Sequence, residues 1–205
     1  MSIRKIARLG HPILRKMAKE VPLDLIQSPK IQQIIIDMKD TVLDSDGAGL
    51  AAPQIHESFQ IILIDLDDGN GFQVWINPKL TPISDDITIS FEGCLSIPDM
   101  RGAVSRYAQV KIEAYNENGE FMVLELEDYP ATVAQHEHDH LLGVLYTDHT
   151  EPGTLAFFDE YKRYKPHLWS MMEDEGSEGE EESQGEEGAP EFSEEEKEEN
   201  SNGLV

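Results

Sequence analysis

The chain has 205 residues and carries 41 acidic against 16 basic side chains, a formal net charge of −25. This charge disfavours DNA or RNA as a main partner, because no surplus of Lys and Arg is available to neutralise phosphates. No apolar run reaches the roughly 20 residues of a membrane-spanning helix, and the N-terminus lacks the apolar core of a secretory signal. A single cysteine, Cys94, excludes an internal disulfide and is typical of a reducing compartment such as the cytoplasm.

The negative charge is concentrated at the C-terminal end. Residues 173–205 hold 15 acidic side chains and one lysine, and from Gly176 onward Glu, Gly and Ser predominate. Such a segment has too few apolar groups to offset the entropy of ordering the chain. We therefore predict a folded domain over residues 1–170 and a disordered acidic tail over residues 171–205. Solubility is the simplest role for the tail, and contact with a basic partner such as a ribosomal surface is the alternative.

The N-terminal half predicts one long helix and several strands. The helix begins at Ser28, has Pro29 in its first turn, and repeats apolar residues on one face as far as Val42. A shorter helix is expected after Pro12. Alternating apolar and polar residues, bounded by turn residues, then predict short strands over residues 60–65, 73–77, 87–91, 109–115 and 120–126.

The C-terminal half predicts two more helices. One runs from Tyr129 to Leu142, with Asp128 as its N-cap and Gly143 at its end, and another covers residues 152–164. A block of strands flanked by helices, without regular alternation of strand and helix, indicates an α+β fold. We expect short antiparallel strands around a central metal-binding helix, 129–142, with additional N- and C-terminal helices.

The helix over residues 129–142 carries the pattern H-E-x-x-H at His136–His140. Histidines four residues apart lie on one face of a helix and can bind one metal ion, which places Glu137 as a base for a water on that metal. His138 points to the opposite side of the helix and is interpreted as a non-ligand. The simpler alternative is a solvated helical face that carries two histidines by chance.

A catalytic metal site of this kind needs a third protein ligand. Glu160 lies about twenty residues downstream of the pattern and would make the protein a zinc peptidase. Cys94 lies just after a predicted strand, and its thiolate would be a good ligand for zinc or ferrous iron. A lone cysteine is also common as a small buried core residue. The residue types alone leave these alternatives open.

Three segments resemble the three signature motifs of the peptide deformylase family. They are Gly47-Ala48-Gly49-Leu50-Ala51-Ala52-Pro53-Gln54, Glu92-Gly93-Cys94-Leu95-Ser96 and Gln135-His136-Glu137-His138-Asp139-His140. Their order and spacing also resemble those of the family, and residues 7–14 look like its usual start. The resemblance covers roughly residues 3–165, and the acidic tail is the clearest departure from it.

This resemblance implies a hydrolase that removes the formyl group from N-formyl-methionine of nascent polypeptides by means of a metal-activated water. It implies Cys94, His136 and His140 as the metal ligands and Glu137 as the general acid and base. Family members work best with Fe²⁺, while Zn²⁺, Ni²⁺ or Co²⁺ can occupy the site. The absence of a transit peptide favours the cytoplasm of a bacterium.

The resemblance also implies roles for residues around the metal. The side-chain amide of Gln54 and the backbone N–H of Leu95 would stabilise the oxyanion formed by attack on the formyl carbon. Gly49 belongs to a stretch of small residues that allows close approach of the substrate, and Arg101 would lie near the bound peptide. Leu95 and Val133 are expected to form walls of the pocket for the methionine side chain.

Gln135 and Asp139 are expected to hold the metal ligands through hydrogen bonds, as metal sites commonly require. The four histidines outside the pattern are assigned to structure or solvent: His11, His56, His149 and His167. A catalytically idle relative that acts as a binding protein is a further alternative, although such proteins typically lose a ligand or the base and none is missing here.

Overall fold

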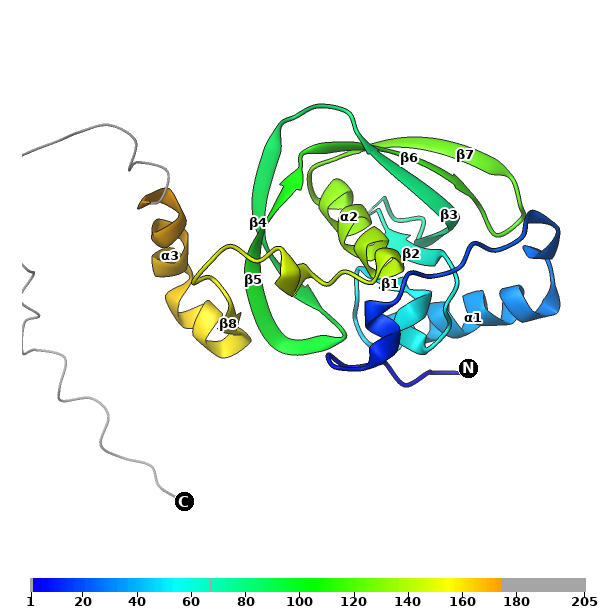
Figure 1. Ribbon diagram of the computed structural model, residues 1–205, viewed down its shortest axis with the longest axis horizontal. Helices are drawn as coiled ribbons and strands as arrows, with labels where there is room; N and C mark the ends of the chain where they lie inside the picture. Colours follow the sequence, from blue (N-terminus) through cyan, green and yellow to red (C-terminus); the bar gives the residue numbers. More distant parts are fainter. Residues whose placement is uncertain (1, 67, 175–205) are drawn as a thin grey trace, which may run out of the picture.

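The computed structural model of the chain describes residues 2–66 and 68–174, with side chains as far as residue 170. Within these ranges, eight strands form two antiparallel sheets, and three α-helices pack around them (Figure 1). No helix in this part of the chain combines the length and apolar character needed to cross a membrane. The predicted acidic tail lies outside the described residues from position 175 onward.

The larger sheet has five strands and supports the core of the molecule. Its strands lie in the spatial order β1 (Gly49–Ala51), β2 (Ile61–Asp65), β3 (Phe72–Pro82), β6 (Gln109–Tyr115) and β7 (Phe121–Glu127). Every neighbouring pair is antiparallel. The smaller sheet consists of β4 (Ile87–Cys94), β5 (Ile97–Tyr107) and β8 (Ala156–Phe157).

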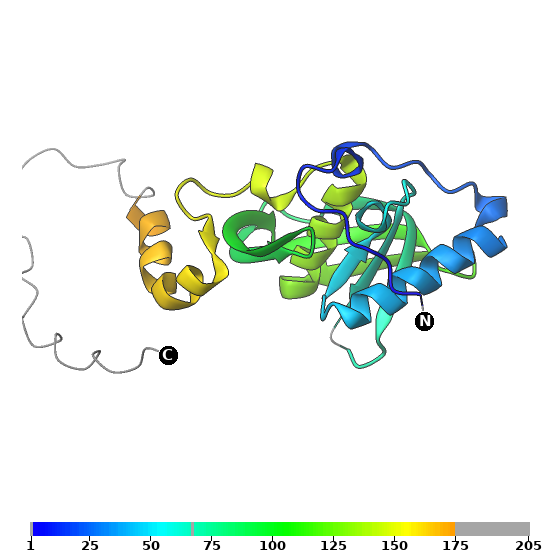
Figure 2. The ribbon, with the colours of Figure 1, turned by 90° about the horizontal axis from the view of Figure 1, so that it is seen from below.

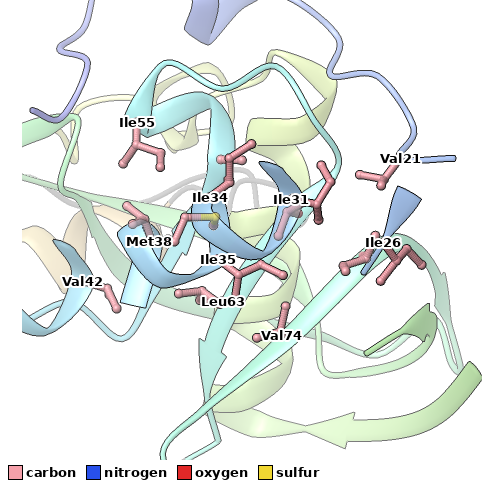
Figure 3. Packing of buried hydrophobic residues seen from close by; sticks show 14 residues of the cluster. Val21, Ile26, Ile31, Ile34, Ile35, Met38, Val42, Ile55, Leu63 and Val74 are labelled. Atoms are coloured by element: carbon pink, nitrogen blue, oxygen red, sulfur yellow. The ribbon is translucent and has the colours of Figure 1, made fainter. Parts of the chain in front are cut away.

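Side chains on the two faces of the large sheet pack against different helices. Ile61 and Leu63 of β2 belong to a core cluster with helix α1 (Pro29–Asp44), which lies against the sheet (Figures 2 and 3). Ile62 and Ile64 point to the other face, where they pack with apolar residues of helix α2 (Asp128–Leu142). Both faces of β2 are therefore buried, which explains its uninterrupted run of isoleucine and leucine.

Helix α2 contacts strands of both sheets, β1 and β2 on one side and β5 on the other (Figure 1). The α+β class with antiparallel strands and N- and C-terminal helices is therefore confirmed. The expected N-cap is wrong by one residue, because α2 begins at Asp128 and Glu127 precedes it in extended conformation, without a side-chain capping bond. Gly143 ends the helix as predicted, with φ of 77° and its N–H bonded to the carbonyls of Asp139 and His140.

Three local expectations differ from the structure. The helix predicted after Pro12 is a single 3-10 turn, η1 (Pro12–Arg15). The helix predicted over residues 152–164 instead begins at Phe158 as α3 (Phe158–Asp174), because residues 156–157 pair with β5. Helix α3 contains Pro166 and is kinked at Tyr164, and it continues beyond residue 170, the predicted end of the folded domain.

The whole of β5 was absent from the predicted strands, although it has 11 residues. Its sequence contains Pro98 and Gly102, both unfavourable within a strand, so its local propensity is low. It forms because it pairs with β4 along most of its length, from Ile87 opposite Tyr107 to Cys94 opposite Ile97. This hairpin places Cys94 at the turn.

Replacing Gly143 with Ala should lower the free energy of unfolding by about 1–3 kcal/mol. Its φ of 77° disfavours any side chain, and an added Cβ would lie 2.8 Å from the Arg15 carbonyl carbon. Gly119→Ala is the matched control, because Gly119 has φ of 81° but an added Cβ there meets nothing nearer than 4.0 Å. Urea titrations of both variants should show the larger loss at Gly143, and equal losses would contradict the steric contribution.

Candidate active site

The three predicted metal ligands come together in one buried cluster. Helix α2 carries His136 and His140 on successive turns, and the end of β4 carries Cys94. Their ligand atoms all lie within 4.8 Å of one another, and Cys94 Sγ is 3.2 Å from His140 Nε2. One sulfur and two imidazole nitrogens at this separation form a donor set suited to zinc, iron and similar divalent ions.

The cysteine and the histidines of the cluster shift one another's pKa values. Burial alone raises the pKa of the Cys94 thiol, but the charge of His140 and hydrogen bonds with both histidines hold it well below its ordinary value. Burial likewise lowers the pKa of His136, but hydrogen bonds with Cys94 and Glu92 hold it well above its ordinary value. The thiolate is the form of cysteine that binds metals, and a bound ion would displace the protons that the cluster retains.

Glu92 holds one of the ligands in position, a role that the sequence analysis missed. His136 Nδ1 lies 2.8 Å from Glu92 Oε2, so the other ring nitrogen, Nε2, is left for the metal. Arg106 binds the same carboxylate through two nitrogens, at 2.8 and 3.1 Å. Burial raises the pKa of Glu92, but the hydrogen bonds from His136 and Arg106 outweigh it and lower the pKa to about 2.

Asp139 supports the position of His136 indirectly. Its Oδ2 accepts a hydrogen bond of 2.6 Å from Arg106, so it reaches the ligand His136 only through Arg106 and Glu92. Gln135 does not hold a ligand, contrary to expectation. Its side-chain amide both accepts from and donates to the backbone of Tyr107, and thereby ties α2 to β5.

Replacing Arg106 with Met should lower metal affinity about 10–100-fold, because it leaves Glu92 buried without its cation and so loosens the carboxylate that holds His136. Removing one partner of a buried pair should also reduce stability by about 3–5 kcal/mol. Arg15→Met is the control, since its pair with Asp148 is about two-fifths exposed and worth less than about 1 kcal/mol. Competition with a chromophoric chelator measures metal affinity. Unchanged affinity in Arg106→Met would show that Arg106 does not help to hold His136 in position.

Glu137 lies in the wall of the same cleft as Cys94 and His136, with one carboxylate oxygen unpaired among the described residues. It is 4% exposed, and its Oε2 has no hydrogen-bond partner among the described residues. Burial raises the pKa of Glu137 to about 7, although the charges of His136 and His140 oppose this. An added Cβ at Gly49 would lie 2.7 Å from Glu137 Oε1, so the predicted glycine leaves room for this carboxylate.

The two predicted oxyanion-hole residues border the same cluster. Gln54 is buried, and its Nε2 lies 3.6 Å from Cys94 Sγ and 3.3 Å from Ser96 Oγ. Its Oε1 accepts a hydrogen bond of 2.7 Å from the Ala51 N–H, which fixes the amide so that its nitrogen faces the cluster. Leu95 lies directly after Cys94, in the turn between β4 and β5.

A cleft of about 660 Å³ gives access to these groups. Of the predicted residues, its walls include Gly49, Gln54, Cys94, Leu95, Arg101, Val133, His136 and Glu137. Glu160, the alternative third ligand, lies elsewhere: it is half-exposed on α3 and pairs with Arg163 at 3.4 Å. His138 is likewise outside the cluster of Cys94, His136 and His140.

A cleft that combines an H-E-x-x-H helix, a buried cysteine and a glutamate without a partner has the composition of a mononuclear metallohydrolase site. Comparison with known proteins agrees with this class. The family model described as polypeptide deformylase matches residues 3–155. The chain therefore belongs to the peptide deformylase family.

Individual relatives cover about three quarters of the chain. A peptide deformylase of Leptospira biflexa is 37% identical over 169 residues, covering 78% of this chain and 94% of that protein. The crystal structure of peptide deformylase from Thermotoga maritima has a TM-score of 0.69 at 37% identity, covering 74% of this chain and all of that one. A Met-Ala-Ser-bound deformylase from Acinetobacter baumannii has a TM-score of 0.68 at 32% identity, covering 73% and 99% of the two chains.

Proposed function

We propose that this protein removes the formyl group from N-formyl-methionine at the start of nascent polypeptides. The observation that carries the proposal is the Glu137 carboxylate: it lines the same cleft as Cys94 and His136, and its Oε2 is buried without a hydrogen-bond partner among the described residues. The Acinetobacter relative with Met-Ala-Ser bound supports a peptide that begins with methionine as the ligand of the cleft. A nascent-chain substrate places the enzyme in the bacterial cytoplasm, within reach of the ribosome.

Cys94, His136 and His140 would hold one divalent ion, and we propose Fe²⁺, with Zn²⁺, Ni²⁺ or Co²⁺ as substitutes that the same donors accept. When bound, the ion would supply Lewis acidity, which polarises the formyl oxygen and lowers the pKa of water. The buried position of all three ligands keeps competing bulk water away from the donors. Their fixed geometry comes from α2 and from the turn of the β4–β5 hairpin.

Glu137 moves the proton. It takes a proton from the attacking water, whose oxygen bonds to the formyl carbon, and then delivers this proton to the amine nitrogen as the C–N bond breaks. The products are formate and a peptide with a free N-terminus. Burial raises the pKa of this carboxyl above its ordinary value, which favours a group that both accepts and returns a proton near neutral pH.

The walls of the cleft would bind the oxyanion and the methionine side chain of the substrate. Gln54 presents an N–H toward the cluster and Leu95 contributes its backbone N–H, so both can donate to the developing negative charge. Val133 and the Leu95 side chain are apolar and line the same cleft, where they would pack against the methionine. Arg101 lines the same cleft and would meet later residues of the peptide.

A deformylation assay tests the proposal. Purified protein loaded anaerobically with Fe²⁺ should release a free amine and formate from formyl-Met-Ala, and should leave acetyl-Met-Ala and an unmodified protein substrate intact. Cleavage of internal peptide bonds would favour the zinc peptidase alternative. Failure to release formate with Fe²⁺, Zn²⁺, Ni²⁺ or Co²⁺, at full metal occupancy, would favour the idle binding protein and overturn the proposal.

A further inference from the structure

The segment that follows the family match touches the cleft. The match ends at residue 155, and β8 begins at Ala156. Ala156 and Phe157 pair with Arg101 and Met100 of β5, and α3 continues from Phe158 beside β4 and β5 (Figure 1). The described part of the chain beyond residue 155 is therefore packed against the strand that carries the cleft residue Arg101.

The guanidinium of Arg101 contacts the ring of Phe158 and lies against Gly93. Its Cζ lies 4.5 Å from the centre of the Phe158 ring, a distance typical of a cation–π contact. It also lies on Gly93, where an added Cβ would come within 2.1 Å of Nη1. Only one of its N–H groups has an acceptor in the described chain, the Met100 carbonyl at 2.8 Å, so the other donors are available in the cleft.

A second aromatic contact fixes α3 against the same wall. The ring of Phe91, which also lines the cleft, lies 4.8 Å from Tyr161 and 5.4 Å from Trp169. These contacts join two successive parts of α3 to β4, on either side of its kink at Tyr164. The helix that carries Phe158 is therefore packed against the cleft wall.

We propose that Phe158 is a positioning residue for peptide binding: it holds Arg101 so that the free N–H donors of the guanidinium meet backbone carbonyls of the residues that follow the substrate methionine. The inference rests on the proposed deformylase function and deepens it. A preoriented guanidinium loses less freedom when the peptide binds, so the segment over residues 156–170 raises affinity for longer peptides. This positioning role of Phe158 does not involve the metal ligands or Glu137.

Phe158→Ala should therefore raise KM for formyl-Met-Ala-Ser about fivefold, with kcat unchanged within about twofold. KM for formyl-Met-amide should change much less, because this substrate lacks the later carbonyls. Phe158→Tyr keeps the ring and should restore the parent KM, whereas Phe158→Leu keeps bulk without a ring and should behave like Ala. Phe157→Ala is the matched control, because Phe157 precedes Phe158 and is two-thirds exposed.

Metal content, thermal unfolding and calorimetric binding of the product peptide Met-Ala-Ser should be measured on every variant. An unchanged KM for formyl-Met-Ala-Ser in both Phe158→Ala and Phe158→Leu would overturn the inference. An equal rise in KM for the amide and the tripeptide would also overturn it, as would failure of Phe158→Tyr to restore binding. If the parent enzyme released no formate but bound Met-Ala-Ser with the same dependence on Phe158, the proposed reaction would fail while the positioning role stood.

Discussion

Glu137→Gln is expected to lower kcat about 10²–10⁴-fold while leaving the metal content unchanged. The amide has the shape of the carboxylate and does not alter Cys94, His136 or His140, but it cannot accept the proton of the attacking water. Burial of the side chain at 4% exposure leaves little room for a bulk-water base to substitute for it. Formate release at saturating formyl-Met-Ala, beside elemental analysis of the same sample, measures both quantities.

Glu160→Gln is the matched control for this prediction. It makes the same chemical change on the exposed surface of α3, and kcat should stay within about twofold of the parent value because an exposed pair such as that with Arg163 contributes little. Near-normal turnover of Glu137→Gln would show that another group transfers the proton. Loss of metal from Glu137→Gln would instead show that the carboxylate supports the cluster, and its effect on rate would then say nothing about proton transfer.

Elements with strong local signals were predictable from the sequence. Helix α1 has a Ser28 cap, a proline in its first turn and one apolar face, and the structure places it where these signals did. Strand β6 alternates apolar and polar residues, and its observed bounds equal the predicted ones. β5 lacked such signals, because its stability comes from pairing with β4, and a partner strand is not visible in the strand's own residues.

The active site shows the same division between local and long-range information. His136 and His140 are one helical turn apart, so their common direction follows from sequence spacing alone. Cys94 is 42 positions earlier than His136, so spacing does not place it beside the histidines; its residue type made it a candidate ligand, and the family resemblance joined it to them. The residue types alone left Glu160 open as the weaker alternative.

The hydrogen bonds that hold His136 in position could not be predicted from the sequence for the same reason. Arg106 binds Glu92 across the β4–β5 hairpin and Asp139 on α2, so it connects three elements, one of which was not predicted. Phe158 was expected within a helix that began six residues earlier, which obscured its contact with Arg101. Both relationships depend on the position of β5, and a sequence analysis without β5 could not bring these residues together.

Cys94→Ser is expected to weaken metal binding about 10²-fold or more and to abolish turnover at limiting metal. A serine hydroxyl stays protonated at neutral pH and is a much poorer ligand for Fe²⁺ or Zn²⁺ than a thiolate. The fold should persist, because Ser has nearly the same volume and its oxygen can replace Sγ as acceptor for the Gln54 amide and the Ser96 N–H. Circular dichroism and chelator competition separate these effects.

His138→Ala distinguishes loss of a ligand from general disturbance of the site. His138 lies on the same helix as the two proposed histidine ligands but outside the cluster, so its removal should leave metal affinity within about twofold, whereas His140→Ala should reduce it as severely as Cys94→Ser. Full metal occupancy in Cys94→Ser would mean that another residue completes the ligand set. Glu160 would be tested first, by the double variant Cys94→Ser with Glu160→Gln, because it is the alternative that the residue types themselves suggest.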